Sequence, residues 1–112
     1  MEEEKLMPRS RNYQDMLIEA LKDPKEALGY LNAILEECQD CDEKEAQKLL
    51  LSALNNIAQA QGGITKLSKK SGLGRESLYK TLSPKGNPKL TTLTNVIHAM
   101  GFDLKFCMPS KR

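Results

Sequence analysis

The residues with the most informative chemistry lie close together between positions 75 and 80. Arg75 has a planar guanidinium that can form two hydrogen bonds to a guanine edge, and Glu76 can accept one from a cytosine amine or hold Arg75 in place. Ser77 and Lys80 lie on the same predicted helix, and Tyr79 can contact a thymine methyl or a phosphate, or pack beside a leucine. The spacing therefore predicts a short helix whose first turn reads base edges in double-stranded DNA.

Positive charge surrounds this helix. Residues 63–112 contain ten Lys and Arg against two Asp and Glu, a net +8, whereas residues 1–62 contain seven against thirteen, a net −6. This asymmetry indicates a polyanionic partner for the carboxy-terminal half, with an ordinary solvated basic surface as the alternative. The lysines expected to contact phosphates are Lys66, Lys69, Lys80, Lys85 and Lys89.

A predicted helix, turn and helix over residues 64–82 must position these side chains. Leu67 and Leu78 are expected to face each other across the bend, and Gly72 stands where the chain needs a positive φ. Gly74 precedes the second helix and completes the set of expected DNA-binding residues. A turn of this kind between two apolar helices is typical of the motif whose second helix enters the major groove.

Helix-start signals recur earlier in the chain. Asp23 is placed to cap a helix that begins with Pro24, and Glu26 can reach back as in a capping box. Asp42 and Glu45 repeat the signal. Apolar residues at helical spacing predict the buried faces of these helices. The face of the first comprises Ala27, Leu28, Leu31, Ile34, Leu35 and Cys38, and that of the second comprises Leu49, Leu50, Ala53, Leu54, Ile57 and Ala58.

The same periodicity predicts a helix near the amino terminus, around Tyr13 and Leu17, and a last helix over residues 90–100. In residues 102–108, Phe102, Leu104 and Phe106 alternate with other residues, which predicts a short strand. A lone strand needs a partner, such as its twin in a dimer. We expect an all-α fold in a single domain over 11–112, with helices over 11–62, the helix-turn-helix module over 63–101, the strand over 102–108 and a disordered acidic tail over 1–10.

Other chemistry is poorly supported. Cys38 and Cys41 form a CxxC pair, and His98 and Cys107 could complete four zinc ligands, but structural zinc sites usually bring a second closely spaced pair. His98 is expected to be a partly buried structural residue. We predict no metal site, no cofactor, no catalytic residue and no enzymatic activity. The amino terminus lacks the apolar core of a signal peptide and no apolar run could span a membrane, so we expect a cytoplasmic protein.

Three stretches of the chain resemble the addiction-module antidote family, the Xre-like helix-turn-helix antitoxins encoded beside RelE/ParE-type toxins. They are LNAILEE (31–37), GGITKLSKKSGLGRESLYKTLSPKGNPKLTTLTNVIHAMG (62–101) and FDLKF (102–106). The likeness covers about residues 11–108. Ser68 departs from the usual Ala, and Gly74 stands where a Ser commonly caps the recognition helix. The second departure costs about a few tenths of a kcal/mol and removes a possible hydroxyl contact to DNA.

The resemblance implies a λ-repressor-like helical fold and a homodimer that binds its own operator, represses the shared promoter and neutralises a toxin by direct contact. It also implies a role for the acidic half, whose Glu- and Leu-rich helices could dock a basic toxin. The alternative is that these helices only complete the core and the dimer. A prophage-type regulator without a toxin and a helical adaptor that binds only protein remain alternative functions.

Overall fold

The computed structural model describes residues 11–108, and every regular element in this range is a helix. The all-α expectation is therefore confirmed for these residues, while the predicted tail over residues 1–10 lies outside them. The six helices are α1 Arg11–Ala20, α2 Pro24–Cys38, α3 Glu43–Ala60, α4 Ile64–Ser71, α5 Arg75–Thr81 and α6 Leu90–Ala99.

The helix-start signals are used largely as predicted. The Asp23 carboxylate accepts a hydrogen bond from the Lys25 backbone N–H at 2.9 Å, and Pro24 occupies the first helical position. The Asp42 carboxylate accepts one from the Glu45 backbone N–H at 2.8 Å. The predicted hydrogen bond from the Asp23 backbone N–H to the Glu26 carboxylate does not form. This N–H donates instead to the Ala20 carbonyl, so that part of the prediction is wrong.

Asp42→Ala should lower the free energy of unfolding by about 1 kcal/mol, because it leaves a first-turn N–H of α3 without its carboxylate partner. Asp40→Ala is the matched control, since it removes one exposed negative charge from the same α2–α3 turn and touches no cap. Urea unfolding of both variants measures the difference. Equal midpoints for the two variants would show that the Asp42 cap contributes nothing.

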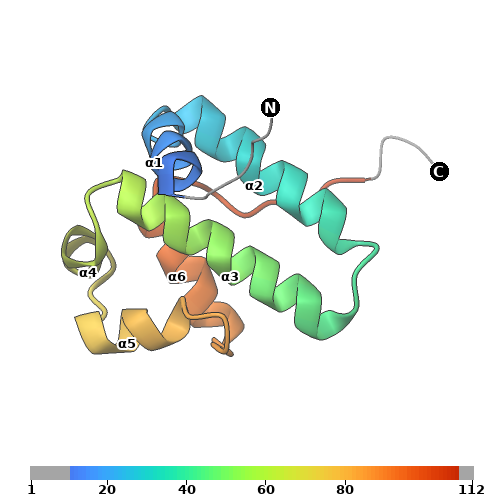
Figure 1. Cartoon of the computed structure of the whole chain (residues 1–112). Coiled ribbons are helices and arrows are strands. Elements are labelled where there is room, and N and C mark those ends of the chain that lie inside the picture. The colour runs from blue at the N-terminus through green and yellow to red at the C-terminus, as the bar shows by residue number, and fades with distance from the viewer. Residues whose placement is uncertain (1–10, 109–112) are drawn as a thin grey trace.

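Helix α3 is the central element of the fold (Figure 1). Helices α1 and α2 lie on one side of it, and α4, α5 and α6 lie on the other. Five of its six buried residues belong to one continuous apolar core that includes residues of both groups of helices. The largest fully buried side chains of the molecule are Leu51, Leu54, Ile57, Leu78 and Val96. The helix that carries the candidate reading residues is thus anchored on the same core as the acidic half.

Two leucines of the predicted α2 face are not buried. Ala27 and Leu31 pack against the core, whereas Leu28 and Leu35 are 48% and 47% exposed. The reason is that α2 lies at the edge of the molecule and packs chiefly on α3, so its apolar stripe is wider than the contact. The buried face of α3 also begins at a different residue than predicted. Leu51 is buried, whereas Leu49 and Leu50, with which the predicted face began, are only half-buried.

The strand predicted at residues 102–108 is wrong for this chain. These residues leave α6 after Gly101 as a segment without regular structure. Phe102 is half-buried and its backbone N–H donates to the Ile97 carbonyl at 3.1 Å. No strand forms because the part of the chain that the structure describes contains no second extended segment for it to pair with. Within residues 11–108, no helix is long and apolar enough to cross a membrane.

Candidate nucleic-acid interface

Helices α4 and α5 are joined by only three residues, 72–74. Gly72 ends α4 in the left-handed region with φ +78°, as its position predicted. Leu67 of α4 and Leu78 of α5 are both buried in the common core, and Leu73 packs half-buried against it from within the turn. The arrangement needs a residue without Cβ strain at Gly72 and apolar residues on either side, which is what this stretch supplies.

Side-chain hydrogen bonds hold this turn although it contains two glycines. The Ser68 hydroxyl donates to the Leu73 carbonyl, and the Leu73 N–H donates to the Ser71 hydroxyl at 3.2 Å. From α6, the Asn95 side-chain amide donates to the Ser71 carbonyl at 3.1 Å, which satisfies a free carbonyl at the end of α4. Ser68 therefore does what the Ala usual at this position could not do, because its hydroxyl ties α4 to the turn. These bonds limit how far α5 can move relative to α4.

All ten predicted DNA-binding residues have exposed side chains or, for glycine, an exposed backbone. Gly74 is the N-cap of α5 and offers no side-chain cap, as expected. Buried Leu78 sets the inner side of α5, so that Glu76 and Lys80, two residues before and after it, point to the opposite side. The structure places Lys66 and Lys69 on α4, Arg75, Glu76, Ser77, Tyr79 and Lys80 on α5, Lys85 in the α5–α6 loop and Lys89 at the N-cap of α6.

The lysines differ in their surroundings. The aliphatic stem of Lys66 lies against Gly62, at the junction of α3 and α4. Lys85 and Lys89 flank a loop that is held close to α5. In this loop, Gly86 approaches the carbonyls at the end of α5 so closely that a Cβ would collide with them, and its own carbonyl accepts a hydrogen bond from the Gln47 side chain of α3. These two lysines are therefore presented on a well-supported loop.

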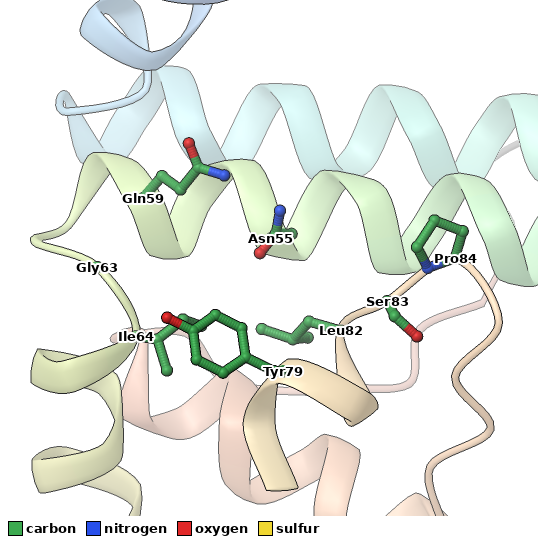
Figure 2. A pocket seen from close by; sticks show the side chains of 8 residues that line it. All are labelled: Asn55, Gln59, Gly63, Ile64, Tyr79, Leu82, Ser83 and Pro84. Carbon is green, nitrogen blue, oxygen red and sulfur yellow. The ribbon is translucent and has the colours of Figure 1, made fainter. Parts of the chain in front are cut away.

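Tyr79 lines a pocket of about 420 Å³ between α3, the start of α4 and α5. Figure 2 shows its ring directed toward Ile64, beneath α3. Leu82 lines the same pocket and its side chain lies beside the ring, and Tyr79 as a residue is 59% exposed. Tyr79 thus lies on the flank of α5 that faces α3.

Comparison with known protein families gives a match over nearly the whole chain. Residues 13–108, which include nearly all of α1 and every later helix, match the family described as "probable addiction module antidote protein". An uncharacterized protein of Haemophilus influenzae is 36% identical over 87 residues, which cover 78% of this chain and 81% of that protein. The chain belongs to the addiction module antidote family. No solved structure matches it.

The chain has two polar residues beside Tyr79 that sequence reasoning missed. Asn55 and Gln59, four residues apart on α3, line the same pocket, and Ser83 lies at its far end (Figure 2). Asn and Gln side chains commonly donate hydrogen bonds to phosphate oxygens. Their spacing places them on one face of α3, but only the packing of α5 against the core brings that face to Tyr79. The spacing alone was therefore not a sufficient signal.

The remaining reactive groups of the described chain offer little chemistry. The pKa of the Cys41 thiol is raised, first by desolvation and then by the neighbouring Cys38, Glu45 and further carboxylates, so the thiolate that attacks disulfides or binds metals is disfavoured. His98 was expected to be partly buried, but it is exposed, with Nε2 at 3.7 Å from an Asp103 carboxylate oxygen. No group of three or more potential metal ligands occurs among residues 11–108.

Proposed function

We propose that this antidote protein is a sequence-specific DNA-binding antitoxin that neutralises a cognate toxin and represses its own operon as a homodimer. The observation that carries the proposal is the exposed set of reading and phosphate-contacting side chains on α4, α5 and the loop after them, supported by a braced turn. Family membership supports the antitoxin role.

In the proposed complex, α4 and α5 form a λ-repressor-like helix-turn-helix, and α5 enters the major groove. Arg75 and Glu76 lie in its first turn, from which side chains reach base edges. Lys69 and Lys80 contact phosphates on either side. Tyr79 lies on the flank toward α3, so we assign it to the phosphate backbone beside Asn55 rather than to a thymine methyl.

The proposed toxin partner is a RelE/ParE-type protein that docks on the acidic half. The exposed acids are densest around the α2–α3 turn, where residues 36–45 contain six Asp and Glu and one Lys. Charge of this sign raises the association rate of a basic partner, and nearby apolar side chains add affinity. In Figure 1 the α2–α3 turn lies at one end of α3, and the start of α5 lies toward the other end.

Gel shifts on the DNA upstream of the protein's own reading frame test the DNA-binding part. We expect sequence-selective binding whose affinity falls steeply as salt rises, because each phosphate contact releases counterions. Equal affinity for upstream and unrelated DNA at moderate salt would contradict the proposal and leave a protein-binding adaptor. Co-purification with the product of the neighbouring reading frame tests the toxin-binding part.

A further inference from the structure

The end of the described chain carries apolar side chains that residues 11–108 leave half or fully exposed. In the extended segment 103–108, Leu104 is half exposed, Met108 is 87% exposed and Phe106 is fully exposed. No backbone hydrogen bond found among residues 11–108 involves this segment, which we call the tail. An aromatic side chain that is free on all sides gains a large apolar burial as soon as a partner surface covers it.

An apolar groove of about 300 Å³ lies elsewhere on the molecule and is lined mainly by carbon atoms. The groove lies between the end of α2, the first half of α3, the α5–α6 loop and the start of α6. The apolar residues along it include Leu35, Cys38, Ala46, Leu50, Pro88 and Leu93. Exposed Leu35 forms part of its rim, which explains why a leucine on the apolar stripe of α2 is left outside the core.

The charges around the groove and along the tail are complementary. The acids of the α2–α3 turn, Glu37, Asp42 and Glu45 among them, lie near Cys41, and this turn borders the groove between Cys38 and Ala46. The tail contains Asp103 and Lys105, which cancel, and the chain continues to Lys111 and Arg112, so residues 103–112 carry a net charge of +2. A basic segment with an aromatic anchor therefore fits an apolar groove with an acidic border.

We infer that the tail of one chain docks in this groove on a second copy of the chain, with Phe106 as the anchor. The exchange is reciprocal, as the two-fold symmetry of a homodimer requires. The tail does not serve its own chain in this way, because Phe106 is fully exposed there. The inference concerns how the proposed dimer assembles, and it stands even if that dimer does not bind DNA.

The Phe106 side chains of the two chains together bury roughly 300–500 Å² in such a dimer, whereas stable interfaces bury about 1,200 Å² or more. The remaining area must come from Leu104, Met108 and the groove walls, so the affinity should be modest. Sedimentation of the wild-type protein should show a monomer–dimer equilibrium at micromolar concentrations, without any DNA. A protein that stays monomeric at every concentration would overturn the inference.

The chain offers a matched pair of variants for the groove. Leu35→Glu places a charge on the rim, whereas Leu28→Glu places it one heptad earlier on α2, at a leucine of nearly equal exposure that does not line the groove. We expect Leu35→Glu and Phe106→Ser each to weaken the dimer at least about tenfold, as loss of an interface anchor does. Leu28→Glu should leave it unchanged. Equal effects of the two glutamates, or no effect of Leu35→Glu, would overturn the inference.

Cross-linking separates exchange between chains from docking on the same chain. In a Cys41→Ser, Cys107→Ser background, Met108→Cys adds a thiol on the same side of the extended tail as Phe106, and Cys38 supplies a thiol in the groove. Diamide should then oxidise the two thiols to an inter-chain disulfide. A Cys41→Ser variant that keeps Cys107 and lacks Met108→Cys is the control, because position 107 lies on the opposite side of the extended tail, and it should cross-link several-fold less. A disulfide confined to monomers, or equal cross-linking from both positions, would refute reciprocal docking.

Discussion

Leu78→Ala is expected to lower the free energy of unfolding by roughly 2–5 kcal/mol, the usual cost of emptying a buried leucine site. Leu78 is completely buried and lies on the inner side of α5, within the core that also contains Leu67 of α4 and Val96 of α6. With only seven residues, α5 has little intrinsic stability and depends on this packing. Because small domains have about 5–15 kcal/mol in total, the variant should be near the limit of folding.

Urea unfolding measures this effect, provided that wild type and variant are compared at several protein concentrations, since association stabilises the folded state. Leu90→Ala is the control, because Leu90 is a leucine at the start of α6 that is 71% exposed. It should change the free energy of unfolding by less than about 0.5 kcal/mol. If Leu78→Ala cost no more than Leu90→Ala, α5 would not be held by the core in the way the structure shows.

Local features of this fold could be predicted because their causes are local. The carboxylates of Asp23 and Asp42 cap helices that begin one residue later, and both bonds depend on residues at most three positions away. Gly72 likewise adopts a positive φ because of the turn in which it lies. The predicted DNA-binding residues on α5 are close together for a local reason too, because they are neighbours in sequence on one seven-residue helix.

Features that depend on distant packing could not be predicted. Helical periodicity shows that Leu28 and Leu35 belong to the apolar stripe of α2, but the width of the buried contact is decided chiefly by how α3 packs against this helix. The tail has the alternation of a strand, yet a strand exists only where a second one is available. Asn95 braces the turn from 24 residues away, a relation that spacing does not reveal.

Arg75→Ala is expected to weaken operator binding by about 1–3 kcal/mol and to relax base choice at one position, because a bidentate contact to guanine is lost. Arg75 is exposed in the first turn of α5 and is not part of the core, so the thermal midpoint should not change. Competition gel shifts with single-base operator variants measure both affinity and base preference. Arg75→Lys keeps the charge but loses the planar fork, so it should retain non-specific affinity and lose selectivity.

Lys69→Ala provides the contrasting case, because Lys69 is an exposed residue in the last turn of α4 and is assigned to a phosphate. It should weaken all DNA binding alike and reduce the slope of log affinity against log salt by about one. The two classes of contact therefore differ in what they change, and not only in how much. If Arg75→Ala lowered specific and non-specific affinity equally, as Lys69→Ala should, Arg75 would be a phosphate contact and another side chain of α5 would have to read the operator.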